Sequence, residues 1–343
     1  MLLNDLFNID IPIIQAPMAG VQNWELAVAV SNAGAMGSIP CGMLSVEKIK
    51  REIKQFTANS DRPYNLNFFC HEMPMVDNDQ LSIWEKTLSV YYRELEIPFE
   101  SNMSGLRMPF NKDVADAIEL YSPKAISFHF GLPSLELLDR IKSWGAKVLS
   151  SATTVKEGLW LEKNGADIGI AQGYEAGGHR GIFLTNDISS QIGKLSLTSQ
   201  LLDKLTVPVI AAGGISSHKD VKALFQLGVS GVQVGTSFLL CPETKTSPVH
   251  RAALKDGRSV TTITNVFSGR PARGIRNRIM QELGDICSVA PKFPYASIAL
   301  APLRQKAEAK MSSDFTPLWS GQNRSGCKEI SAVELTKELW DDC

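Results

Sequence analysis

This sequence lacks the features that mark several large classes of protein. Its 343 residues carry 35 basic and 36 acidic side chains, spread evenly for a net charge of −1. That balance gives no basic surface for nucleic acid or for an anionic membrane. No apolar run reaches the ~18 residues that a membrane-spanning helix requires, and the start of the chain lacks the basic region of a signal peptide. Small neutral or singly charged molecules are therefore the expected binding partners.

The six cysteines are scattered and form neither a Cys-x-x-Cys pair nor a zinc-type spacing with histidine. A disulfide framework or a metal site would need such clustering. We therefore expect reduced thiols, no metal and a cytoplasmic location.

Short β-compatible runs alternate with amphipathic helical stretches over most of the chain, which is typical of a parallel sheet built from βα units. Such an alternation with eight strands predicts a (β/α)₈ TIM barrel, an α/β fold, over residues 1–242. The expected strands are residues 12–18, 36–40, 64–69, 125–130, 147–152, 168–171, 208–214 and 231–239.

Two stretches break the alternation. Residues 71–111 have no clear strand, so we expect one or two helices inserted over the barrel mouth or along its side. Residues 243–326 also show no strand pattern but contain a helix near 302–311, which predicts a mainly helical accessory segment over the substrate pocket. The alternative is a peripheral extension that only covers apolar barrel surface. Residues 327–343 end the chain in a C-terminal helix.

The stretch Ile168–Gly181 looks like the organising element of the chain. Its first four residues form a buried strand, and the glycines that follow lift the backbone out of the sheet. His179 is then expected on a loop at the carboxyl end of a strand, the face of a barrel where chemistry takes place. The alternative is a solvated His-Arg pair on a surface turn.

Two glycine pairs end the last two expected strands. Gly213-Gly214 and Gly235-Thr236 would lie side by side, and a helix would begin at Ser216 or Ser217. Small residues there let backbone N–H groups approach an anion, and the helix N-terminus favours negative charge. Either pair alone is more often a tight turn, but the two together predict a phosphate site.

Amide side chains are expected on the opposite side of the mouth. Asn67 and Gln172 end their strands, and the backbone of Ala16, Pro17 and Met18 follows the first strand. Amides both donate and accept hydrogen bonds, as the pyrimidine edge of a flavin requires. Each amide has a purely structural alternative at its strand end. A phosphate site together with these amides favours FMN over a phosphosugar.

With these residues in place, the chain resembles the bacterial class I nitronate monooxygenases, formerly called 2-nitropropane dioxygenases. The resemblance implies an FMN enzyme that oxidises alkyl nitronates, such as propionate 3-nitronate, with O₂ to carbonyl compounds and nitrite. The motifs that carry it are residues 15–18, 67–71, 175–181, 211–214, 231–236, 268–274 and 318–322.

The resemblance also implies roles for single residues. His179 would be the catalytic residue: an imidazole with a pKa near 6.5 takes the α-proton of a nitroalkane, and its cation pairs with the nitronate. FMN would be held by Ala16, Pro17, Met18, Asn67, Gln172, Gly177, Gly178, Gly213, Gly214, Gln233, Val234, Gly235 and Thr236.

The substrate residues are less well matched to the family. Tyr295 matches a substrate-pocket tyrosine, and either Arg304 or Lys306 would take the role of a basic residue. Ala299 stands where some relatives have a second tyrosine. His129 is a further candidate for the substrate pocket, with a structural role as its alternative.

Two competing functions use the same residues. The first is an NAD(P)H-dependent flavin reductase of the same barrel type, acting on quinones or enoyl-acyl carrier protein. Arg180 after the histidine, the late motifs and the lack of a separate dinucleotide fingerprint speak against it. The second is a barrel without flavin or without activity. A phosphosugar isomerase would want a carboxylate base, for which Glu175 is the only nearby candidate. The oligomeric state stays open.

Overall fold

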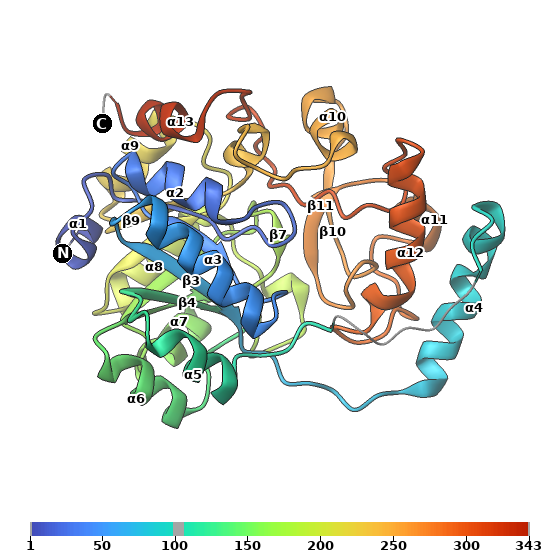
Figure 1. Ribbon diagram of the computed structural model, residues 1–343, viewed down its shortest axis with the longest axis horizontal. Coiled ribbons are helices and arrows are strands. Elements are labelled where there is room, and N and C mark those ends of the chain that lie inside the picture. Colours follow the sequence, from blue (N-terminus) through green and yellow to red (C-terminus); the bar gives the residue numbers. More distant parts are fainter. Residues whose placement is uncertain (1, 99–105, 342–343) are drawn as a thin grey trace.

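The computed structural model describes residues 2–98 and 106–341. Eight parallel strands form a barrel, drawn on the left of Figure 1, and a smaller second part lies on the right. Their order around the sheet is β1-β9-β8-β6-β5-β4-β3-β2, and a bridge between Ile14 and Met36 brings β2 back beside β1. The predicted TIM barrel is thus confirmed. Its strands are β1 (Ile13–Gln15), β2 (Gly37–Pro40), β3 (Tyr64–Phe69), β4 (Ala125–His129), β5 (Lys147–Ala152), β6 (Ile168–Gln172), β8 (Val209–Ala212) and β9 (Gly231–Val234).

Helices cover the outside of the barrel, as a parallel sheet with two apolar faces requires. They are α2 (Trp24–Asn32), α3 (Val46–Asn59), α5 (Lys112–Glu119), α6 (Leu135–Ser143), α7 (Val155–Lys163), α8 (Lys194–Lys204) and α9 (His218–Leu227). Local sequence sets their ends: the Ser45 side chain accepts a hydrogen bond from Lys48 N at the start of α3. Gly165, with φ +99°, follows the end of α7 as predicted.

Two further helices and two 3₁₀ turns complete the barrel. Helix α1 (Leu3–Phe7) closes its amino end, where Leu3 N donates to Ser230 O at 3.0 Å. Helix α13 (Ala332–Trp340) packs against α2 and α9. The last strand is shorter than expected, because a 3₁₀ turn, η2 (Thr236–Leu240), replaces its second half. Another 3₁₀ turn, η1 (Ile188–Ser190), precedes α8.

The second part contains a sheet that the sequence analysis missed. Strands β10 (Thr261–Thr264), β11 (Ala272–Ile275) and β7 (Gly178–His179) pair in the antiparallel order β10-β11-β7. Residues 243–326 are mainly helical, as expected, but they also contain the two short strands β10 and β11, which the sequence pattern did not predict. The strands are short, and β11 buries Arg273 at 2% exposure, so it lacks the apolar alternation that identifies a half-buried strand.

The helical insertion also lies elsewhere than expected. Helix α4 (Asn78–Glu94) packs against α12 (Ala296–Ala309) at the far edge of the second part, rather than over the barrel mouth or along the side of the barrel (Figure 1). Trp84 Nε1 donates to Ala296 O at 3.1 Å, and Tyr92 OH donates to Ala299 O at 2.7 Å. Part of the insertion, residues 99–105, is outside the described residues. Helices α10 (Pro248–Asp256) and α11 (Arg278–Leu283) complete this part.

Within residues 2–98 and 106–341, no helix has the length and apolar character needed to cross a bilayer. The segment boundaries at residues 242 and 326 stay a prediction.

Candidate active site

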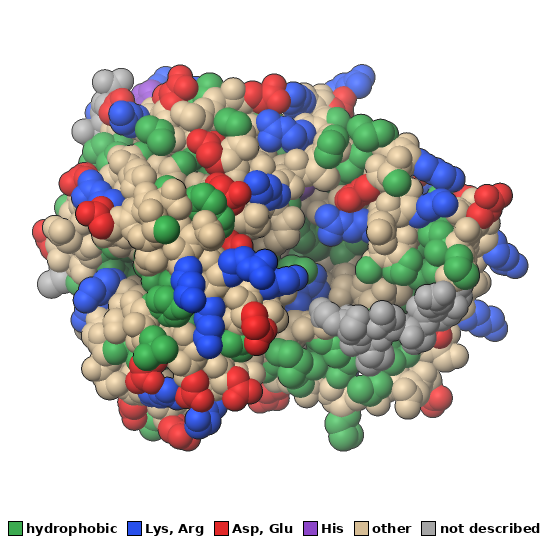
Figure 2. Space-filling view, viewed as in Figure 1, with side chains coloured by type: hydrophobic (Ala, Val, Ile, Leu, Met, Phe, Trp, Pro, Cys, Tyr) green, Lys and Arg blue, Asp and Glu red, His purple; other side chains and the backbone are tan. Residues whose placement is uncertain are grey.

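A cavity of about 210 Å³ opens at the carboxyl ends of the barrel strands. In the space-filling view, the surface is hollowed where the barrel meets the second part, and Lys and Arg side chains lie around this hollow (Figure 2). The cavity is lined by strand ends of the barrel and, from the second part, by His250, Arg304, Trp319 and Asn323. The two parts therefore build one site together.

At one end of the cavity, glycine backbone replaces side chains. Gly213 and Gly214 have φ of +109° and +64°, and a Cβ on Gly213 would lie 2.9 Å from Ala176 N. A side chain there would therefore be both strained and crowded. No described residue accepts a hydrogen bond from the backbone N–H groups of Gly214, Gly235 and Thr236. This end is thus a cradle of free N–H donors suited to an anion.

The start of α9 contributes less to this cradle than expected. Ser217 is the N-cap, but the Asp220 carboxylate already accepts from Ser216 N at 2.9 Å and from Ser217 N at 3.1 Å. A carboxylate at a helix N-terminus neutralises the field that would attract another anion. The glycine turns, rather than the helix terminus, therefore provide the anion site.

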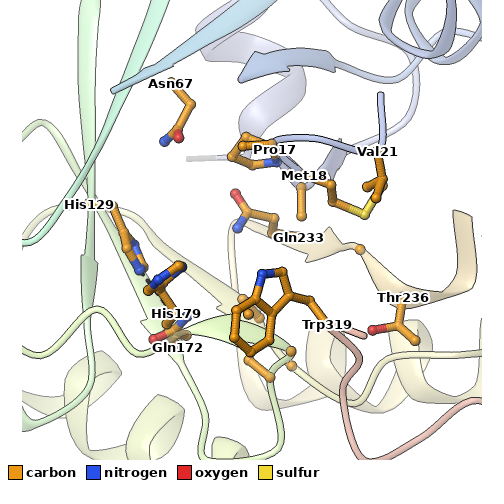
Figure 3. A pocket seen from close by; sticks show the side chains of 18 of the residues that line it. Pro17, Met18, Val21, Asn67, His129, Gln172, His179, Gln233, Thr236 and Trp319 are labelled. Atoms are coloured by element: carbon orange, nitrogen blue, oxygen red, sulfur yellow. Dashed lines mark hydrogen bonds between the residues drawn. The ribbon is translucent and has the colours of Figure 1, made fainter. Parts of the chain in front are cut away.

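A late segment of the chain closes over the same end. Gly321 N donates to Thr236 Oγ1 at 2.9 Å, and Asn323 Nδ2 donates to Ser216 Oγ at 2.7 Å. These bonds hold Trp319 in the cavity, where Figure 3 shows its indole between the His179 side and Thr236. Trp319, from the motif at residues 318–322, is thus a part of the cavity wall.

The amide side chains divide into two groups. Gln172 is occupied by its own loop, because Nε2 donates to His179 O at 2.9 Å and Oε1 accepts from Gly181 N at 2.7 Å. Asn67 Nδ2 donates to Ser127 Oγ at 2.9 Å. Gln233, by contrast, makes no side-chain hydrogen bond within the described part of the chain, and it faces the cavity in Figure 3. Gln233 is therefore the amide with the most freedom to bind a ligand.

His179 lies at the other end of the cavity, in the short strand β7. Its Nε2 is 2.8 Å from Ser268 Oγ, and its ring centroid is 5.5 Å from those of Phe293 and Trp319. Burial, followed by the charge of Arg107, lowers the pKa of His179 well below its usual value. The His179 ring is therefore neutral, with a pKa below the ordinary value near 6.5 used in the sequence analysis.

The charge of the cavity is one-sided. The charged lining residues are Arg107 and Arg304, the three lining histidines are neutral because burial lowers their pKa, and no described lining residue is an Asp or Glu. Among the described side chains, Arg107 donates to Ser297 Oγ at 3.3 Å and its guanidinium lies 5.7 Å from the centroid of the Phe293 ring. Burial lowers its pKa to about 10, so it stays cationic at neutral pH. Arg304 pairs with Glu308 at 2.9 Å. Arg107, which has no carboxylate partner within the described residues, therefore favours an anionic ligand on its side of the cavity.

His250 adds a neutral polar group to the same wall. It is 2% exposed, its Nε2 has no partner within the described residues, and burial lowers its pKa to about 4. It remains an uncharged hydrogen-bonding group at neutral pH.

Arg180, which follows the histidine, supports the loop from behind. It is fully buried and donates to Gln172 O at 3.1 Å, to Ala176 O at 3.4 Å and to Gln191 Oε1 at 2.9 Å. These bonds fix the loop at both ends, so Arg180 has a structural role.

The four predicted substrate residues separate in the structure. His129 and Arg304 line the cavity, and His129 Nε2 donates to His179 O at 3.0 Å. Tyr295 does not line it, because its hydroxyl donates to Pro74 O at 3.1 Å. Lys306 is exposed on α12 and also lies outside the lining.

The structure brings the predicted flavin residues together around one cavity. Those that line it are Ala16, Pro17, Met18, Asn67, Gln172, Gly177, Gly178, Gly213, Gly214, Gln233, Val234, Gly235 and Thr236. The sequence analysis assigned no role to Arg107, His250, Ser268 or Asn323. Ser268 begins a motif that had been noticed, but Arg107 lies in a stretch without periodicity that would have identified it.

Comparison with known proteins places these features in a family. The family model described as Nitronate monooxygenase matches residues 1–342. The chain is 38% identical over 342 residues to a probable nitronate monooxygenase of Bacillus subtilis, covering 98% of this chain and 97% of that protein. It is 37% identical over 341 residues to the nitronate monooxygenase of Pseudomonas aeruginosa, with the same two coverages.

Solved structures agree with this placement. The nitroalkane oxidase from Streptomyces ansochromogenes matches with a TM-score of 0.89 at 33% identity, over 98% of this chain and 96% of that one. FabK from Thermotoga maritima, at 23% identity with a TM-score of 0.72 over 98% of this chain and 94% of that one, shares the fold. The chain belongs to the nitronate monooxygenase family, a family of oxidoreductases that act on nitronates.

Proposed function

We propose that this protein uses FMN to oxidise alkyl nitronates, such as propionate 3-nitronate, with O₂ to carbonyl compounds and nitrite. The observation that carries the proposal is the charge of the cavity: two arginines and no described carboxylate line it, while the three lining histidines are neutral. A nitronate is an anion, whereas its parent nitroalkane is neutral. A cavity of this charge binds the anion more tightly.

The residues present fit FMN. The free N–H groups at Gly214, Gly235 and Thr236 suit a phosphate, and a Cβ on Gly213 would crowd this cradle. Gln233, two residues before Gly235, offers an amide to a planar hydrogen-bonding ring, and Pro17 and Met18 offer an apolar surface. A flavin held there supplies an acceptor for the electrons of the nitronate, which O₂ then takes up.

The other groups of the site prepare the substrate. Arg107 and Arg304 supply positive charge to an anionic substrate, and a carboxylate at its far end, as in propionate 3-nitronate, pairs with a guanidinium. Phe69, Phe293 and Trp319 surround the ring of His179 and keep water away from it. His179 stays neutral at neutral pH because its pKa is lowered. It accepts the α-proton when a neutral nitroalkane is bound.

Anaerobic stopped-flow absorbance tests the proposal. The purified yellow protein is mixed in separate runs with propionate 3-nitronate and with NADH. We expect the nitronate, and not NADH, to bleach the flavin. Bleaching by NADH alone would move the protein to the alternative, an NAD(P)H-dependent reductase of the same barrel family. A colourless protein that gains no flavin absorbance from added FMN would refute the cofactor.

We also propose that the protein acts in the cytoplasm. The support is chemical: Cys41, Cys70, Cys241, Cys287 and Cys327 are free thiols, as expected in a reducing compartment. Mass spectrometry after alkylation of the native cell extract tests this. Widespread oxidation of these five thiols would argue against it.

A further inference from the structure

Ser268 makes the one side-chain hydrogen bond to the His179 ring within the described residues. Its Oγ is 2.8 Å from His179 Nε2, 3.2 Å from Arg270 O and 3.4 Å from Arg270 N. The other ring nitrogen, Nδ1, has no partner in this part of the chain. Nδ1 is not among the fully buried polar atoms, so it is accessible. Because His179 lines the cavity, Nδ1 is open to it.

The single proton of the Ser268 hydroxyl decides where the ring proton sits. Arg270 O can only accept, and Arg270 N–H can only donate. If the hydroxyl donates to Arg270 O, its lone pairs accept from Arg270 N–H and from His179 Nε2–H, and every group has a partner. If the hydroxyl donates to His179 Nε2 instead, Arg270 O loses this bond. Full satisfaction of the buried groups favours the first arrangement.

We propose that Ser268 is a positioning residue that holds His179 in its Nε2–H tautomer, so that Nδ1 is the atom that meets the substrate. The role of this tautomer in catalysis rests on the proposed function, but the tautomer itself follows from the hydrogen bonds alone. Neither the resemblance nor the cavity lining gives Ser268 a role.

The surroundings leave Ser268 without a competitor for Nε2. The charged and titratable groups that act on His179 are Arg107, His129, Arg270 and His71, from four separate segments, and none is a carboxylate. His129 donates to the backbone oxygen of His179 rather than to its ring. A carboxylate partner would favour the imidazolium. A hydroxyl fixes the tautomer and leaves the ring neutral.

Ser268 is itself rigidly held, as a positioning residue must be. It is 1% exposed, and Ser268 N and Gly269 N both donate to Asn265 O, at 3.3 and 2.7 Å. Gly269 has φ +86°, and a Cβ there would lie 2.0 Å from Pro291 O. The turn between β10 and β11 therefore has little room to move.

The proton transfer then follows. A neutral nitroalkane binds with its α-carbon toward Nδ1. The C–H bond breaks, its electron pair stays on the substrate and spreads to the nitro oxygens, and the proton moves to Nδ1. Nε2–H continues to donate to Ser268 Oγ, so the imidazolium keeps a partner at that nitrogen. A preformed nitronate has no such proton to lose and bypasses this step.

Nitrogen NMR of FMN-loaded protein with ¹⁵N-labelled histidine tests the tautomer directly. The chain has only five histidines, so the His179→Gln spectrum identifies the signals of His179. At pH 7.5 we expect a protonated Nε2 and an unprotonated Nδ1 in the wild type, and a mixture of tautomers in Ser268→Ala. A wild-type ring protonated at Nδ1, or an unchanged tautomer in Ser268→Ala, overturns the proposal.

Kinetics test the consequence. We expect Ser268→Ala to lower kcat/KM for nitroethane roughly tenfold, the effect of losing one orienting hydrogen bond. The change for ethyl nitronate should be less than about twofold, and Ser268→Thr, which keeps the hydroxyl, should restore most of the loss. Ser31→Ala is the matched control: Ser31 is also buried and donates to a backbone oxygen, Pro63 O, but lies outside the cavity.

The two proposals fail in different ways. If the tautomer is as expected but neither nitronate nor nitroalkane is oxidised, the proposed function is wrong and Ser268 still positions the ring. If nitronates are oxidised and Ser268→Ala lowers both activities equally, with a lowered melting temperature, Ser268 is only structural.

Discussion

The two ends of the cavity work on different principles. At the β8–β9 end, the binding groups are backbone N–H donors, and glycines give them access. At the His179 end, the groups are side chains: Arg107, His129, His179, Ser268 and Trp319 come from five separate stretches of the chain. The first end depends on conformations that only glycine adopts easily. The second depends on the second part of the molecule packing against the barrel.

This difference explains why the two ends suit different ligands. A cofactor phosphate is the same in every turnover and is well served by a fixed backbone cradle. A substrate that gives up a proton and electrons needs groups whose charge and hydrogen-bonding direction are set by neighbours, as burial and Ser268 set those of His179. The predictions below change one end while leaving the other intact.

The largest expected effect is at the His179 end. His179→Asn should lower kcat/KM for nitroethane by about 10²–10⁴, the usual contribution of a general base, because asparagine cannot take the proton. FMN should remain bound, since the backbone oxygen that Gln172 and His129 hold is unchanged. Steady-state rates with nitroethane and with ethyl nitronate measure this. An equal loss on both substrates would contradict a role as base.

At the other end, Gly213→Ala should weaken FMN binding. The left-handed φ of +109° and the 2.9 Å approach to Ala176 N both oppose a side chain. A cost of ~1–2 kcal/mol for the backbone alone gives roughly a 5- to 30-fold rise in Kd. Fluorescence titration of the flavin-free protein measures it. Gly145→Ala is the control, because Gly145 has φ +85° but nothing within 4 Å of its added Cβ. Equal weakening of FMN binding by both variants would show that the backbone at Gly213 does not form the FMN site.

The same contrast decides how far the sequence could predict the site. Buried strands such as β6 are short apolar runs, and Gly213-Gly214 and Gly235 mark the turns after them, so the barrel and the cradle can be predicted from local sequence. The side-chain end needs long-range contacts. Trp84 of α4 meets Ala296 of α12 across 212 residues, and no local pattern records that pairing.

Buried polar residues are the second reason why parts of the fold and of the site could not be predicted from the sequence. Arg273 makes β11 look polar although it is buried, and its guanidinium donates to Tyr174 O at 3.0 Å. Ser268 was part of a recognised motif, yet only the folded chain shows that it meets His179. The charge of the cavity is likewise a property of the fold, because Arg107 and Arg304 come from distant segments.

A smaller effect is expected at Arg107, which should distinguish substrates that carry a carboxylate from those that do not. Arg107→Gln keeps a donor for Ser297 but removes the charge, and it should raise KM for propionate 3-nitronate about tenfold, within the range of a charge-assisted hydrogen bond. KM for propyl 1-nitronate, which has no carboxylate, should change by less than about threefold. Lys306→Gln is the control, because Lys306 is basic but lies outside the cavity. The same KM change for both substrates would show that Arg107 does not recognise the carboxylate.

The smallest expected effect concerns pH. The pKa of His179 is lowered, so the neutral ring that accepts a proton is already fully present at the ordinary histidine pKa and above. Activity on nitroethane should therefore vary by less than about twofold between pH 6.5 and 8, and should fall only as the pH drops through the lowered pKa. Ser268→Asp would place a carboxylate beside Nε2 and raise that pKa, which should move the acidic limb upward. Initial rates across this range, with FMN saturating, provide the measurement. A wild-type limb centred near pH 6.5 or above would mean that the cations and the burial around His179 do not control its proton.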